Sequence, residues 1–176
     1  AELRRCAGTH FDPDVVDAMC NGVDAEFFSP DHALPSPYRE EEVPVVFTGA
    51  MDYWPNVDAA VWFSGAVLPR LRERHPALRF YVVGRSPAPA VQALAGAGVV
   101  VTGTVDDVRP YLAHAAVVVA PLRIARGIQN KVLEAMAMAR PVVASAACAG
   151  PIDATSGVEL LAAESAEDYL GHIETL

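Results

Sequence analysis

Positive charge gathers in one stretch in the second half of the chain. Between Val108 and Leu133 the sequence contains no Asp or Glu, yet it contains four bases: Arg109, Arg123, Arg126 and Lys131. Residues 126–131 read R-G-I-Q-N-K and lead directly into a segment with the pattern of a helix. Exposed backbone N–H groups, the helix dipole and two of the bases, Arg126 and Lys131, would converge there, which predicts an anion site, most naturally for a mono- or diphosphate. The alternative is a solvated basic loop beside a buried helix.

A carboxylate follows in the second turn of the same expected helix. Glu134 stands between Leu133 and Met136, in an otherwise apolar stretch. A carboxylate in such surroundings suits a ribose diol, which offers two hydroxyl donors. Two other interpretations stay open: the side chain extends to solvent, or it pairs with Lys131 three residues earlier.

Polar and aromatic residues also follow the first expected strand of the chain. Asp52, Trp54 and Asn56 stand in this loop. Asn56 is either a ligand contact or the N-cap of the next helix. Trp54 either contacts a ligand or packs against the fold. The five histidines are scattered, and no Ser/His/Asp arrangement suggests a nucleophilic enzyme.

Several well-known site motifs are absent from the sequence. There is no G-x-G-x-x-G after the first strand, no G-x-x-x-x-G-K-[ST], no G-x-S-x-G and no H-E-x-x-H. These absences argue against a dehydrogenase, a P-loop NTPase, an α/β-hydrolase and a zincin. The three cysteines form no C-x-x-C or Cys/His cluster, so no structural zinc is expected. We expect neither a metal ion nor a cofactor.

The elements that would position these residues alternate regularly from residue 43 onward. Five short runs are apolar throughout, as expected of strands buried on both faces of a parallel sheet: 45–48, 80–83, 99–102, 116–119 and 141–144. Helical patterns separate or follow them: 57–74, with Pro69 kinking or dividing the helix, then 89–97, 106–114, 128–139 and 166–176. This order predicts an α/β fold with a Rossmann-like, doubly wound parallel sheet.

Ligands of such sheets bind beyond the carboxyl ends of the strands. Five loops should therefore line the site: 49–56, 84–89, 103–107, 121–131 and 145–151. All five open with or contain a glycine, which lets the backbone turn sharply or approach a ligand.

The composition of the chain limits the classes of protein to which it can belong. The chain has 176 residues, of which 52% are hydrophobic, so it can bury a sizeable core and is not generally disordered. Its net charge of −9 argues against nucleic acid as a partner, although a few local bases could still hold a small anion. The longest apolar runs are too short to span a bilayer. Without an initiator Met or a signal peptide pattern, the chain is expected to be part of a longer cytoplasmic protein.

Residues 1–42 do not follow the alternation. Val15–Cys20 could form a strand that ends at the turn Asn21-Gly22. We therefore expect residues 1–28 to be the remnant of an upstream domain with a hinge strand. Residues 29–42, rich in Pro and polar residues, are expected to be a linker, and residues 43–176 the Rossmann-like domain.

These segments together resemble a known family. Residues 21–30 (N-G-V-D-A-E-F-F-S-P) resemble the hinge of GT-B glycosyltransferases that carry the Glu-x7-Glu signature (glycosyl transferases group 1). Residues 133–144 (L-E-A-M-A-M-A-R-P-V-V-A) are similar to that family's L-E-A-M-A-x-G-x-P-V-V motif. Residues 47–58 and 121–131 resemble, more specifically, bacterial sugar transferases of exopolysaccharide gene clusters.

The resemblance implies that the chain is the C-terminal, donor-binding domain, whose partner is the N-terminal domain that carries most of the acceptor site. Glu134 aligns with the second Glu of the signature, which binds the ribose. Arg126 stands where the first Glu would be, and the Arg and Lys that usually follow the first strand are absent. Arg126 and Lys131 are therefore expected to stabilise the leaving diphosphate. The expected contacts to the nucleotide sugar are Gly49, Met51, Asp52, Asn56, Gly84, Arg85, Val105, Asp106, Gly127, Ile128, Gln129, Asn130 and Glu134.

The function implied is that of a retaining, hexose-transferring glycosyltransferase that makes an exopolysaccharide or another envelope glycan. The nucleotide sugar would be its donor substrate, and the full-length enzyme would associate with the inner face of the membrane through its acceptor. The chain alone is expected to be inactive, because the acceptor half is missing. Two alternatives stay open: a nucleotide-sugar epimerase with the GT-B fold, and a non-catalytic flavodoxin-like interaction module.

Overall fold

A six-stranded parallel sheet forms the centre of the computed structural model, which describes residues 22–96 and 98–176. The strands are β1 (Val43–Thr48), β2 (Leu78–Val83), β3 (Val99–Gly103), β4 (Val117–Ala120), β5 (Val142–Ser145) and β6 (Leu161–Ala163). The helices are α3 (Trp54–Ala66), α4 (Leu68–Arg74), α5 (Pro89–Gln92), α6 (Arg109–Ala113), α7 (Asn130–Ala137), α8 (Ala146–Ala149) and α9 (Ala166–Thr175). The strand that the sequence predicts at Val15–Cys20 lies outside the described residues.

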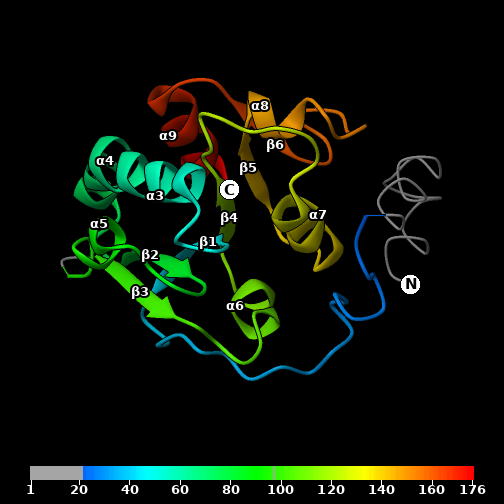
Figure 1. Ribbon diagram of the computed structural model, residues 1–176, viewed down its shortest axis with the longest axis horizontal. Helices are drawn as coiled ribbons and strands as arrows, with labels where there is room; N and C mark the ends of the chain where they lie inside the picture. Colours follow the sequence, from blue (N-terminus) through cyan, green and yellow to red (C-terminus); the bar gives the residue numbers. More distant parts are fainter. Residues whose placement is uncertain (1–21, 97) are drawn as a thin grey trace.

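The strand order is β3-β2-β1-β4-β5-β6, and every neighbouring pair is parallel. The chain reverses its direction of winding between β1 and β4, so the loops after these two strands diverge and leave a crevice at that edge of the sheet. The predicted Rossmann-like α/β fold is confirmed. Helices cover both faces of the sheet, with α3, α4 and α9 packed together and α6 and α7 on the opposite side (Figure 1).

The helix predicted from residue 57 to 74 is divided, as Pro69 suggested. α3 ends at Ala66, and α4 begins at Leu68 with Pro69 in its first turn. Phe63 of α3 is fully buried and packs its ring against Phe80 of β2, with 4.6 Å between the ring centroids. This contact holds α3 in place against the sheet.

Three predicted helices are shorter than expected. α5 ends at Gln92, because Gly96 and Gly98 adopt positive φ angles of 140° and 101° that turn the chain back toward β3. α6 begins only at Arg109, whose N–H donates to the Asp107 carboxylate in a turn that precedes the helix. α7 ends at Ala137, two residues before Ala139 with its φ of 53°. A sixth strand, β6, was not predicted.

Residues 22–42 run along the outside of the domain and contact α6 (Figure 1). The Tyr38 hydroxyl donates to the Tyr111 carbonyl at 2.6 Å, and the His114 ring bonds the Leu34 carbonyl at 2.6 Å. The Arg109 guanidinium lies 3.8 Å from the centroid of the Phe27 ring. These contacts fix the described part of the segment against the helix that precedes β4.

The loops after β1 and β2 touch through their backbones. Gly49 and Gly84 have φ angles of 153° and 149°, and the Gly49 N–H donates to the Val83 carbonyl at 3.0 Å. A Cβ atom on Gly84 would lie 1.7 Å from the Gly49 carbonyl oxygen. The close approach of these two loops therefore requires glycine at position 84.

We expect Gly84→Ala to destabilise the fold by about 1–3 kcal/mol, because the new methyl group must displace backbone and the φ angle disfavours it. Gly65→Ala is the matched control, since it adds the same methyl group in α3, where the new carbon would contact nothing beyond the adjoining backbone of its own helix within 4 Å. The control should be neutral or stabilising by up to about 1 kcal/mol. Urea unfolding measures both, and equal stabilities of the two variants would contradict the assigned loop contact.

Candidate functional site

A pocket of about 390 Å³ opens at the carboxyl ends of β1 and β2, beside the first turns of α7. Eight of the predicted site residues line it: Gly49, Asn56, Gly84, Val105, Gln129, Asn130, Lys131 and Glu134. The structure therefore brings the loop after β1, the loops after β2 and β3, and the start of α7 to one place. The lining also includes Thr48, Ala50, Tyr53, Val83 and Val108, which sequence analysis did not select.

Lys131 reaches from α7 across to the loop after β1. Its Nζ donates to Asn56 Oδ1 at 2.6 Å and lies 4.6 Å from the centroid of the Phe47 ring. Removal of the ammonium from water lowers the pKa of Lys131 to about 8, while the neighbouring Cys148 and Glu134 oppose that shift. The present surroundings of the Lys131 ammonium thus do not fully compensate its loss of hydration, and an anion bound in the pocket would stabilise the charged form.

Asn56 joins the two sides of the pocket and is not an N-cap. Tyr53 occupies the N-cap position of α3, and Asn56 is buried in the first turn. Its Nδ2 donates to the Ala50 carbonyl at 2.9 Å while its Oδ1 accepts from Lys131. The capping alternative is therefore wrong. The side-chain amide of Asn56 bonds the Ala50 carbonyl and the Lys131 ammonium, not a backbone N–H at the start of α3.

Glu134 lies on α7, one turn after Lys131, and is partly buried in the pocket lining. Burial raises the pKa of its carboxyl, and the Lys131 ammonium partly opposes this. Within the described residues no ion pair of 4.0 Å or less joins the two side chains, which disfavours the pairing alternative. The carboxylate oxygens are available to hydrogen-bond donors of a ligand.

The four bases of the acid-free stretch do not act together. Arg109 forms an ion pair with Asp107 at 2.7 Å, and Arg123 forms one with Asp58 of α3. Arg126 is exposed and does not line the pocket, and no ion pair with Asp52 forms among the described residues. Of the two bases predicted to converge at the start of α7, Lys131 lies in the pocket lining and Arg126 does not.

The remaining predicted residues lie outside the pocket lining. Met51 is fully buried in the core, and its backbone N–H and carbonyl are bonded to Arg85 and Ala88. The others are exposed: Asp52, Arg85, Asp106, Arg126, Gly127 and Ile128. Of the lining residues that were missed, Thr48 and Val83 end their strands, so the rule that ligands bind at the carboxyl ends of strands could have selected them.

Two features are absent from the described residues. No three His, Cys, Asp or Glu side chains gather there in an arrangement that could hold a metal ion. None of the helices in that part of the chain is long and apolar enough to cross a membrane.

Comparison with known families identifies the class of protein. The profile of the family described as Glycosyl transferases group 1 matches residues 42–176, which is most of the chain. The chain belongs to this family. A search of curated proteins finds no match.

Solved structures show the same fold at low sequence identity. A glycosyltransferase from Rickettsia africae matches with a TM-score of 0.65 and 14% identity, over 86% of this chain and 44% of that chain. Anabaena HepE in complex with UDP-glucose matches with a TM-score of 0.60 and 16% identity, over 88% and 46%. The C-terminal domain of the group 1 protein LpcC from Francisella tularensis matches with a TM-score of 0.57 and 16% identity, over 88% and 87%. This chain therefore spans less than half of the first two proteins.

The lowered pKa of Lys131 predicts a specific dependence of stability on pH. Between about pH 8 and 10.5 the unfolded chain holds a proton on this lysine that the folded chain has released, so the free energy of unfolding should rise with pH across this window. Below pH 8 the cost of burying the charged Lys131 lowers the free energy of unfolding by its full amount. In Lys131→Met this contribution disappears, and the difference between the wild-type and variant curves should slope upward from pH 8 to 9.5.

The matched control is Arg126→Met, which removes an exposed guanidinium that stays charged over the same range. Its unfolding curves should run parallel to those of the wild type at every pH. Urea unfolding at half-unit intervals measures all three proteins. Parallel curves for wild type and Lys131→Met would show that the ammonium is not desolvated.

Proposed function

We propose that this chain is the donor-binding domain of a retaining glycosyltransferase, and that the pocket binds a nucleoside-diphosphate sugar. The observation that carries the proposal is the placement of Lys131, held by Asn56 against the loop after β1, one helical turn before the carboxylate of Glu134. A cation for phosphate and a carboxylate for a diol then face one cavity at the point where the sheet reverses its winding.

The diphosphate would lie against the start of α7. The first N–H groups of a helix have no partners within the helix, and its dipole favours negative charge. Lys131 stands in this first turn, so the ammonium and the backbone donors would act on the same phosphate oxygens. When the glycosidic bond breaks, the charge that develops on the leaving diphosphate would be stabilised by groups already in place.

The nucleoside would occupy the other end of the pocket. Val83, Val105 and Val108 supply an apolar wall there for a base. Glu134 would accept hydrogen bonds from the ribose hydroxyls, and these donors would favour the charged carboxylate against the burial that raises its pKa. Because Gly84 has no side chain, a base could approach the backbone there. A side chain at this position would in addition collide with Gly49.

Retention, hexose transfer and an exopolysaccharide or other envelope glycan as product remain parts of the proposal. Their support is the resemblance of the motif at 133–144 and of residues 47–58 and 121–131 to bacterial sugar transferases. The acceptor half is proposed to lie in a separate N-terminal domain, because this chain spans less than half of HepE and of the Rickettsia enzyme. We accordingly expect no sugar transfer by this chain alone.

The test is a calorimetric comparison of uridine, UMP and UDP, with the guanosine series run beside them. Lys131→Met should weaken UDP by about 1–3 kcal/mol and leave uridine unchanged, because it removes a charge-assisted contact to phosphate. Glu134→Gln should instead weaken all three ligands alike, by about 1.5–3 kcal/mol, because each contains the ribose. Lys131→Met therefore widens the difference from wild type only for the ligand with the diphosphate, whereas Glu134→Gln weakens every ligand that contains the ribose.

Glu73→Gln, an exposed carboxylate of α4, is the control for Glu134→Gln and should bind all ligands normally. Arg126→Ala decides whether the exposed guanidinium adds a second phosphate contact, which would show as a further loss for UDP alone. If neither the uridine nor the guanosine series binds, or if Lys131→Met leaves the gap between nucleoside and diphosphate unchanged, the proposed function is wrong.

A further inference from the structure

The last residue of β1 carries a hydroxyl group that the fold does not use. Thr48 lines the pocket beside α7 and is 4% exposed. Its Oγ1 is buried and has no hydrogen-bond partner among the described residues. A hydroxyl that is taken out of water without a partner costs stability, so such groups are rare in folded proteins. One that stands in the lining of a binding pocket points to a partner that the chain itself does not supply.

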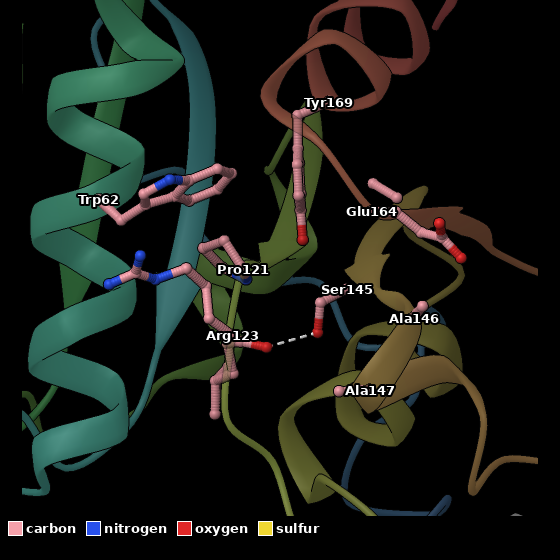
Figure 2. Close-up of a pocket in the computed structure, with 10 residues that line it drawn as sticks. Trp62, Pro121, Arg123, Ser145, Ala146, Ala147, Glu164 and Tyr169 are labelled. Carbon is pink, nitrogen blue, oxygen red and sulfur yellow. Dashed lines mark hydrogen bonds between the residues drawn. The ribbon is translucent and has the colours of Figure 1, made fainter.

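A second hydroxyl in an equivalent place shows how the fold usually satisfies such a group. Ser145 ends β5, as Thr48 ends β1, and it lines a separate hollow between α3 and α9. Its hydroxyl donates to the Leu122 carbonyl at 2.6 Å, the bond drawn as a dashed line in Figure 2. The same oxygen accepts from the Cys148 N–H at 3.3 Å. The Ser145 hydroxyl is therefore satisfied within the fold, in contrast to that of Thr48.

The pairing of the strands places Thr48 on the face of the sheet that α6 and α7 cover. Thr48 is paired with Val83 of β2, and paired residues of neighbouring strands share a face. Val83 in turn shares its face with Tyr81, two residues earlier, whose ring packs against Tyr38 with 4.6 Å between the centroids. Tyr38 is bonded to α6. Thr48 therefore lies on the same side of the sheet as Glu134 of α7, and both line the same pocket.

The chemistry around Thr48 narrows what its hydroxyl can bind. On this face the pocket wall is apolar at Val83 and Val108, and the ionised carboxylate of Glu134 can only accept hydrogen bonds. A ribose hydroxyl that donates to this carboxylate still has lone pairs on its own oxygen, and a threonine O–H can donate to them. The Thr48 hydroxyl would thus supply the donor that a ribose hydroxyl needs and that Glu134 cannot provide.

We propose that Thr48 is a specificity-determining residue of this pocket, and that its hydroxyl binds a ribose hydroxyl of the nucleotide together with Glu134. This inference rests on the proposed function. Because Oγ1 is covered in the free chain, the contact would form after a rotation about the Cα–Cβ bond, which moves the hydroxyl to another of its staggered positions. The consequence is a preference for ribonucleotides over deoxyribonucleotides that depends on Thr48.

The test compares UDP with 2′-deoxy-UDP and 3′-deoxy-UDP by calorimetry. Thr48→Val removes the hydroxyl and keeps the shape of the side chain, so its affinity for UDP should fall about three- to tenfold. The substitution should leave unchanged the affinity for whichever deoxy analogue lacks the contacted hydroxyl, and should weaken the other analogue as it weakens UDP. Thr48→Ser, which keeps the hydroxyl, should retain the preference of the wild type for UDP.

The stability of the free protein separates a ligand contact from a structural role. Thr48→Val should be at least as stable as the wild type in urea unfolding, because a methyl group replaces a buried hydroxyl that has no partner in the described part of the chain. Thr102→Val is the matched control for binding. The Thr102 hydroxyl donates to the Gly103 carbonyl at 2.9 Å and lies outside the pocket lining, so this variant should bind UDP and both analogues normally.

The outcomes distinguish this inference from the proposed function. If the wild type binds UDP and Thr48→Val binds it equally well, the role of Thr48 is wrong and the nucleotide site stands. The same conclusion follows if Thr48→Val weakens UDP and both deoxy analogues alike, or if it is less stable than the wild type, because either result assigns the hydroxyl a structural role. If the wild type binds no nucleotide, the proposed function and this inference fail together.

Discussion

The hydrogen bond between Lys131 Nζ and Asn56 Oδ1 is the interaction on which the site depends. It joins residues 75 positions apart, one on α7 and one in the first turn of α3. These two helices follow β4 and β1, the strands between which the sheet reverses its winding. Without this bond the ammonium would face a partly desolvated pocket with no neutral acceptor, and α7 would lose its side-chain hydrogen bond to α3.

Glycine at two strand ends makes that arrangement possible. A side chain on Gly49 would reach within 2.7 Å of the Asn56 amide and 3.0 Å of the Lys131 ammonium, and one on Gly84 would collide with the Gly49 carbonyl. The space that the two glycines leave is therefore the space into which the lysine and the asparagine extend. The backbone at Gly49 and Gly84 and the side chains of Asn56 and Lys131 therefore pack together at this edge of the sheet. This packing places the pocket at the strand ends rather than farther along the strands.

Local sequence patterns predicted the helices and strands that depend on neighbouring residues. They missed the side-chain contacts between residues that are far apart in the sequence. Continuous Val-rich runs gave five of the six strands, and Pro69 correctly divided α3 from α4. β6 was missed because its three residues, Leu161–Ala163, are neither β-branched nor numerous. For Asn56 the local pattern left a cap and a ligand contact open, because its partner Lys131 stands 75 residues away in the sequence. Arg123 is neutralised by Asp58, 65 residues earlier, and no window around Arg123 could have shown that.

Because Lys131 is the only lysine of the chain, its side chain can be observed by itself. Incorporation of ¹³C-labelled lysine gives one signal for the carbon next to the ammonium, and its chemical shift follows protonation. A pH titration should give a pKa near 8 for the free protein and a higher pKa in the presence of saturating UDP, because a phosphate favours the charged form. A pKa near the ordinary value of about 10.4 in the free protein, or one that UDP does not raise, would contradict the account.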